Sequence, residues 1–185
     1  MNEITIIPIK NFPEITEGDD LIELLINCLE NSTISIEEND IIVITQKIVS
    51  KSESRLRNLE DVTFEELLAA ESTEIIRKRG DLVIARTKHG FICANAGIDK
   101  SNIENGHALL LPIDPDRSAS KYREQIYARL QKKVAVIISD TFGRPWRVGQ
   151  VNFAIGSSGI EPLVSYIGST DTFENELNAT EIAII

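Results

Sequence analysis

One run of six residues constrains the fold of this chain more than any other feature. Residues 134–139 read Val-Ala-Val-Ile-Ile-Ser, and Asp140 and Thr141 follow directly. An apolar run of this length predicts a buried strand. A strand that ends in Asp-Thr presents a carboxylate and a hydroxyl at the edge of a sheet, and hard cations bind such oxygens. The structural alternative is that Asp140 only caps or turns the chain.

A second apolar run, Ile-Ile-Val-Ile-Thr at residues 41–45, predicts a strand buried on both faces. Gln46, Lys47 and Lys51 come next in the chain. A lysine at the exit of a strand supplies a point charge for phosphate, and the alternative is a solvated lysine on the surface.

The other periodic segments alternate between helix and strand without a regular βαβ order. We expect strands at 3–9, 82–87, 91–94, 108–113, 151–155 and 163–167, and helices at 21–30, 63–79 and 118–132. This mixture predicts an α+β fold with a mixed β-sheet and flanking helices rather than a doubly wound one. No linker or repeat divides the chain, so residues 1–185 form a single unit, either one domain or two interlocked lobes.

Composition excludes several classes of protein. Of the 185 residues 42% are hydrophobic, which is enough for a sizeable core. The net charge of −10 argues against a nucleic-acid groove, because phosphate backbones are met by clustered Lys and Arg. Cys28 and Cys93 are too few for a disulfide framework and are expected to be buried and reduced. Without a signal peptide or an apolar run of about 20 residues, the expected location is the cytoplasm and not a membrane.

Two polar loops carry further candidate residues. The loop 142–147 brings Arg144, Trp146 and Arg147 close to Asp140, a combination suited to phosphate or carboxylate ligands. The loop 95–102 bends at Gly97 and offers Asp99 and Asn102 as oxygen or amide ligands, with an Asx turn as the alternative. Neither His89 nor His107 has a partner at catalytic spacing, and no P-loop, dinucleotide fingerprint or nucleophile elbow occurs.

Five blocks of sequence, taken together, carry a family resemblance. They are EGDD at 17–20, TQKIVSK at 45–51, HGFICANAGIDKSN at 89–102, LLP with DPD within 110–116, and SDTFGRPWRVGQ at 139–150. Their order and context resemble the coenzyme F-420-0:L-glutamate ligase (gamma-glutamyl ligase) family over nearly the whole chain.

The resemblance implies a GTP-dependent ligase. In such enzymes the terminal carboxylate of the deazaflavin precursor F-420-0 is activated, and the amine of L-glutamate attacks it to form an amide. Further glutamate is added through the γ-carboxyl group. The resemblance also implies Mg or Mn together with potassium, small-molecule partners only, and an interlocked homodimer with the family's α+β fold.

The matching positions imply roles for individual residues. Asp99, Asp140 and Thr141 match metal ligands. The positions that match nucleotide contacts are Lys10, Asn11, Phe12, Pro13, Gln46, Lys47, Lys51 and Asn102. From residue type and place, we assign Arg144 or Arg147 to the incoming glutamate or to the charge that develops in the reaction.

The sequence departs from the family pattern in two places. Ligases of this family usually continue well past Ile185, and they have a longer helical segment between Arg55 and Gly80. We therefore expect the C-terminal part of the family fold, with its further metal and phosphate contacts, to be absent. Two alternatives follow: a catalytically incomplete homologue that binds metal and nucleotide, or a glutamyl ligase that acts on another carboxylate.

Overall fold

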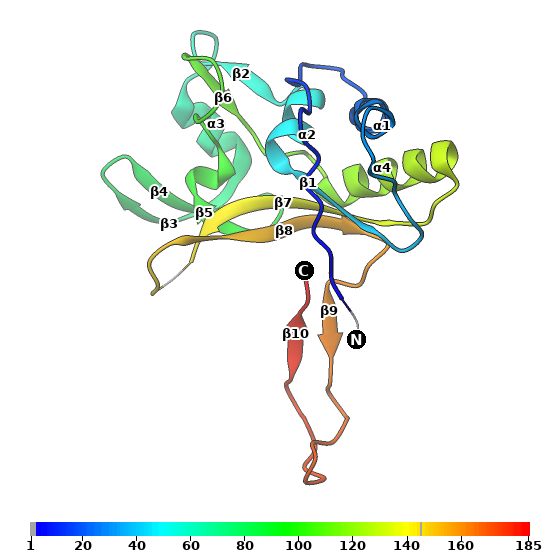
Figure 1. Ribbon diagram of the computed structural model, residues 1–185. Coiled ribbons are helices and arrows are strands. Elements are labelled where there is room, and N and C mark those ends of the chain that lie inside the picture. Colours follow the sequence, from blue (N-terminus) through cyan, green and yellow to red (C-terminus); the bar gives the residue numbers. More distant parts are fainter. Residues whose placement is uncertain (1–2, 145) are drawn as a thin grey trace.

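The two apolar runs form neighbouring strands of one mixed sheet. In the computed structural model, which describes residues 3–144 and 146–185, β1 (Ile41–Thr45) pairs in parallel with β7 (Ala135–Gly143). β7 in turn pairs antiparallel with β8 (Gln150–Ser158). This sheet confirms the predicted α+β class (Figure 1).

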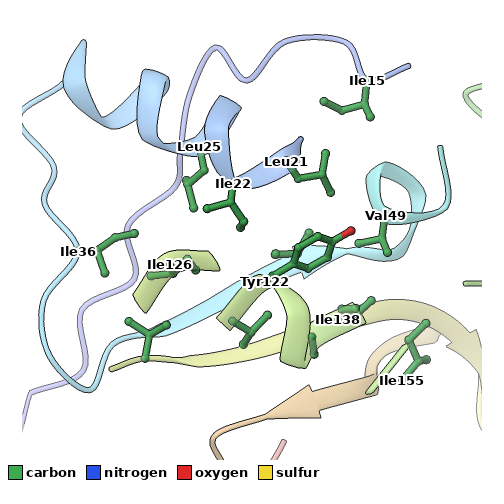
Figure 2. Packing of buried hydrophobic residues seen from close by; sticks show 14 of the residues in the cluster. Ile15, Leu21, Ile22, Leu25, Ile36, Val49, Tyr122, Ile126, Ile138 and Ile155 are labelled. Carbon is green, nitrogen blue, oxygen red and sulfur yellow. The ribbon is translucent and has the colours of Figure 1, made fainter. Parts of the chain in front are cut away.

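Three helices lie together on one side of this sheet (Figure 1): α1 (Leu21–Glu30), α2 (Gln46–Ser52) and α4 (Pro115–Leu130). Figure 2 shows the main core between them, where Ile22 of α1, Val49 of α2 and Ile126 of α4 meet Ile138 of β7. All four side chains are fully buried. None of the helices in the described part of the chain is long and apolar enough to cross a membrane.

A second, smaller group of elements lies beside the main sheet. Its members are β2 (Leu56–Asn58), α3 (Phe64–Glu71), β3 (Ser72–Arg79), β4 (Leu82–Thr87), β5 (Ile92–Ala94), the 3₁₀ turn η1 (Asn95–Gly97) and β6 (His107–Leu109). β3, β4 and β5 form an antiparallel sheet, and β2 pairs with β6. Two small apolar clusters, centred on Leu67 and Val83, hold this group together.

The last described residues form a hairpin that projects from the main sheet (Figure 1). β9 (Leu163–Ser165) pairs antiparallel with β10 (Glu181–Ala183) in a sheet of two strands. Leu163 and Ile182 are about half exposed. A pair of strands this short is only marginally stable without further packing.

The predicted helix at 63–79 is wrong in its second half. A capping box of Thr63 and Glu66 starts α3 as expected, but the helix ends at Glu71 and residues 72–79 form β3. β-branched residues favour a strand here, and β4 supplies a pairing partner. Gly80, expected to stop the helix, instead turns the β3–β4 hairpin with a φ of +57°.

Other segment predictions also need correction. Residues 3–9 form no strand and leave Ile4 93% exposed, because no neighbouring strand pairs with them. β1 is not buried on both faces: Val43 is 60% exposed on this edge strand. Of the strand expected at 108–113, only the start is paired, in β6. The cysteines are free as predicted, although only Cys93 is fully buried.

We expect Gly156→Ala to destabilise the fold by about 1–3 kcal/mol. A Cβ atom at Gly156 would lie 2.4 Å from the backbone carbonyl carbon of Pro115, at the start of α4. Gly143 is the matched control, because a Cβ there would have no neighbouring atom within 4 Å. Urea unfolding followed by circular dichroism gives both free energies of unfolding. Equal values for Gly156→Ala and Gly143→Ala would contradict the expectation.

Candidate functional site

Parallel pairing of β1 and β7 brings two predicted site residues together. The last pair in register is Thr45 with Ser139, so both strands reach the same edge of the sheet. Lys47 follows in the first turn of α2, and Asp140 follows Ser139 directly. Ligands of α/β proteins bind at this carboxyl edge of parallel strands, since the chain ends converge there.

Asp140 and Thr141 lie within β7, rather than in the loop after it. β7 continues to Gly143, and Asp140 and Thr141 pair with Phe153 and Asn152 of β8. A bulge in the ladder between Ile138 and Ser139 precedes Asp140, and such bulges redirect the side chains that follow. The strand is therefore longer than its apolar run, because β8 supplies hydrogen bonds to its polar end.

Burial raises the pKa of the Asp140 carboxyl above its ordinary range. Two groups oppose this shift: the Thr141 backbone N–H, which donates to Asp140 Oδ1 at 2.8 Å, and the charge of Lys47. The Thr141 hydroxyl donates to Asn152 Oδ1 at 2.8 Å. Asp140 is thus a half-buried carboxylate, and a cation beside it would favour its ionised form.

Asp99 reaches the same place from the second group of elements. Asn95 and Ala96 both have positive φ angles, of 52° and 54°, and turn the chain sharply in η1 before it. Asp99 then exchanges two backbone hydrogen bonds with Leu109, of 2.9 and 2.8 Å. Strained backbone of this kind costs about 1–3 kcal/mol per residue and is often retained where it fixes a functional side chain.

Lys47 pairs with Asp99 and is influenced by the charge of Asp140. Its ammonium forms an ion pair with Asp99 Oδ2 and donates to the backbone oxygen and the hydroxyl of Ser101 at 3.2 and 3.0 Å. Burial lowers the pKa of Lys47, and the charge of Asp140 opposes that shift. The structure therefore pairs one ammonium with Asp99, within electrostatic reach of Asp140, at the edge of the main sheet.

Lys51 extends this charged row along α2. It stands one turn after Lys47, about 6 Å along the helix axis, and forms an ion pair with Glu14. Glu14 continues directly from the predicted segment of Lys10, Asn11, Phe12 and Pro13. Phe12 packs against the main core, whereas the other three line a cavity of about 570 Å³ between this segment and α1.

Some predicted site residues lie apart from this cluster. Gln46 is 2% exposed and donates to Ser50 Oγ at 2.6 Å and to the Leu110 backbone oxygen at 3.3 Å, so its side chain fixes α2. Arg144 and Arg147 are exposed in the β7–β8 connection, where Arg144 donates to the Val148 backbone oxygen at 3.3 Å. Pro145 of this predicted loop lies outside the described residues.

Two residues of the cluster, Glu14 and Ser101, were not predicted from the sequence, and one predicted residue, Asn102, makes no contact described for the cluster. Glu14 and Ser101 contact Lys51 and Lys47, but neither follows a buried strand or stands in a recognisable ligand pattern. Ser101 lies inside the predicted loop, and its place beside Asp99 was the available signal. Asn102 is exposed, with a positive φ of 56°.

The donor set fits a hard cation that also binds phosphate. Within residues 3–144 and 146–185 no three His, Cys, Asp or Glu residues group together. Mg²⁺ is commonly held by one or two carboxylates, with the remaining ligands from water and substrate phosphates. Asp99 and Asp140 fit that pattern, with the Thr141 hydroxyl next to Asp140. Fold and site together define an α+β protein with a cluster of charged side chains, Lys47, Asp99 and Asp140, at the carboxyl edge of its main sheet.

Comparisons with known proteins identify the family of the chain. A sequence profile of the family described as F420-0:Gamma-glutamyl ligase matches residues 10–185. The chain is 37% identical over 198 residues to the coenzyme F420:L-glutamate ligase of Methanothermobacter thermautotrophicus, with 98% of the chain and 79% of that relative covered. Identity to the enzyme of the same name from Archaeoglobus fulgidus is 38% over 194 residues, with 96% and 76% covered. The enzyme of that name from Methanocaldococcus jannaschii is 40% identical over 166 residues, with 80% and 66% covered. The chain belongs to the F420-0:gamma-glutamyl ligase family.

Proposed function

We propose that this protein is a GTP-dependent ligase that joins L-glutamate to the deazaflavin precursor F-420-0 through an amide bond. The observation that carries the proposal is the ion pair of Lys47 with Asp99, within electrostatic reach of Asp140, at the carboxyl edge of β1 and β7. Amide formation from a carboxylate requires activation of that carboxylate, which we propose occurs by phosphoryl transfer from GTP, and phosphoryl transfer depends on positioned cations. The name of the family and the names of the relatives support F-420-0 and L-glutamate as the substrates that are joined.

The row of charges suggests how the nucleotide lies. Lys51 stands near the segment of residues 10–13, whose cavity of about 570 Å³ is of a size that holds a small ligand. The lysines at 47 and 51 are separated by about 6 Å along α2, a span comparable with a triphosphate chain. We place the nucleoside toward residues 10–13 and the γ-phosphate toward Lys47, where Asp99 and Asp140 also lie.

Mg or Mn would be held by Asp99, Asp140 and Thr141, together with oxygens of the nucleotide. When bound, a divalent cation supplies charge neutralisation, so that the anionic carboxylate of the acceptor can approach the γ-phosphate. Lys47 and Lys51 contribute fixed positive charge along the phosphates. Arg144 or Arg147, at the tip of the β7–β8 hairpin, holds the carboxylates of L-glutamate.

We also propose that the chain functions as a homodimer. Ile4 and Ile6 are at least 90% exposed, and the β9–β10 hairpin leaves Leu163 and Ile182 half exposed. Apolar side chains gathered on extended, unsupported segments are typical of a surface that another chain covers. A homodimer accounts for both segments at once, and light scattering on the purified protein measures it.

The function is tested with the purified 185-residue protein, GTP, Mn, potassium, L-glutamate and F-420-0. We expect GDP release coupled to a product heavier by one glutamyl residue in mass spectrometry. Omitting the metal should abolish both, and ATP should replace GTP poorly. Metal-dependent thermal stabilisation by GTP without any product would instead identify a binding-competent but catalytically incomplete homologue. Product formation with another carboxylate, but not with F-420-0, would show that the protein is a glutamyl ligase with a different acceptor.

A further inference from the structure

A second cavity, of about 720 Å³, opens on the other side of Asp99 from α2. It lies among α3, the β3–β4 hairpin and the segment that follows η1. Phe64, Leu68 and Val83 provide an apolar wall, and Lys78 and Lys100 provide positive charge. The Lys100 ammonium rests 4.0 Å from the centre of the Phe64 ring.

This cavity meets the charged cluster at two residues. Asp99 and Ser101 line the cavity, and both also contact the ammonium of Lys47. The cavity of residues 10–13 approaches the same lysine row from the other end, next to Glu14 and Lys51. A phosphate chain along the row would therefore run from one cavity toward the other, and its last phosphate would lie at the mouth of the second.

The size and lining of the second cavity select among the remaining reactants. Cavities of roughly 300–1,000 Å³ accommodate ligands of drug size, and the lining of this one combines an apolar wall with a larger number of polar and charged side chains. L-Glutamate is small and fully polar, so it would fill little of this space and leave Phe64 and Leu68 unmatched. An acceptor with a flat aromatic body and an anionic side chain matches both the apolar wall and the two lysines.

The charges of the side chains that line the cavity indicate under which condition an anionic acceptor binds. Glu65, Asp81 and Asp99 outnumber Lys78 and Lys100, so the lining is net negative without a metal. A divalent cation held by Asp99 reverses that balance. Binding of an anionic acceptor should therefore depend on metal.

We infer that the cavity between α3 and the β3–β4 hairpin binds the aromatic, anionic carboxylate acceptor, with Lys78 and Lys100 recognising its side chain and Phe64 and Leu68 its ring system. The inference rests on the proposed ligase function and adds to it the place of the acceptor. Its carboxylate would then extend past Asp99 and Ser101 toward the γ-phosphate beside Lys47. Glutamate would approach from elsewhere, consistent with the arginines of the β7–β8 connection.

The test measures F-420-0 binding and steady-state ligase kinetics for the variants Lys78→Gln and Lys100→Gln. Lys88→Gln is the matched control. Lys88 is an exposed lysine at the far end of β4 and does not line the cavity. Fluorescence of F-420-0 titrated with protein, in the presence of Mn and GDP, reports acceptor binding without turnover. We expect each cavity variant to raise the dissociation constant roughly tenfold, and Lys88→Gln to leave it unchanged. In the wild type, omitting Mn should weaken binding by at least as much.

Steady-state kinetics test the acceptor site separately from the ligase function. We expect the cavity variants to raise KM for F-420-0 with little change in KM for GTP or L-glutamate. A wild type that ligates F-420-0, with variants that keep its KM, would overturn the acceptor site and leave the ligase function intact. A rise in KM for glutamate alone would assign the cavity to that substrate and equally overturn the inference. A wild type that binds F-420-0 in this cavity without ligating it would refute the activity but not the site.

Discussion

Asp140→Asn is expected to lower kcat/KM of the ligase reaction by about 10³-fold. Asparagine keeps the size of the side chain and the acceptor for the Thr141 N–H, but it removes the charge that faces Lys47. Loss of a ligand charge weakens the hold on a divalent cation, so the apparent affinity for Mn should fall as well. Initial rates measured over a range of Mn concentrations give both quantities.

Stability provides the control for this variant. Burial raises the pKa of Asp140, so the folded protein binds its proton more tightly than the unfolded chain does, and the ionised carboxylate destabilises the fold at neutral pH. Asp140→Asn should therefore unfold at the same temperature as the wild type or higher at pH 7. That advantage should shrink as the pH falls toward 3.8, the ordinary pKa. Asp61→Asn, in an exposed turn, should change neither rate nor stability. Near-normal turnover of Asp140→Asn would remove Asp140 from the metal site.

The strands that carry the central residues of the site could be predicted, because they form from apolar runs of consecutive residues. Two apolar runs, each followed by polar side chains, predicted the two strands and the candidate residues at their ends, and the structure adds that the strands pair in parallel. The helix expected at 21–30 is also local in origin, because the Asp20 side chain accepts from the backbone N–H groups of Ile22 and Glu23 at the start of α1. Periodicity and capping depend on residues close in the chain, so a single sequence contains them.

The features that were missed depend on partners distant in the chain. Residues 72–79 had a helical pattern, and only the pairing with β4 makes them a strand. The length of β7 depends on β8, which extends the ladder past the apolar run to Asp140 and Thr141. The pairing of Lys51 with Glu14 joins residues 37 positions apart. No local rule predicts such contacts, because they arise only when the packed elements fix the distance between the residues.

Arg55 helps to hold Asp99, which follows η1, in a fixed position relative to Lys47 of α2. It follows α2, and its Nε donates to the backbone oxygen of Leu111 at 2.7 Å. Its Nη2 forms an ion pair of 2.9 Å with Glu71 at the end of α3, and both side chains are largely buried. The Arg55 backbone oxygen also accepts from Leu110 N at 3.2 Å. Since Leu109, the preceding residue, is bonded to Asp99, this clamp fixes Asp99 relative to Lys47.

We expect Arg55→Met to lower the free energy of unfolding by about 3–5 kcal/mol, because it leaves the Glu71 carboxylate buried without its partner. For a chain of this length that corresponds to a fall in Tm of roughly 6–20 °C. Arg86→Met, which breaks the exposed ion pair with Glu74 on the neighbouring sheet, should cost less than about 1 kcal/mol. In the double variant Arg55→Met with Glu71→Leu, part of the loss should be recovered, since no charge remains unpaired. Denaturant unfolding of these three variants, of Glu71→Leu alone and of the wild type measures the coupling between Arg55 and Glu71. If Arg55→Met were as mild as Arg86→Met, Arg55 would not be the clamp, and the position of Asp99 would depend on the strained turn at Asn95 and Ala96 instead.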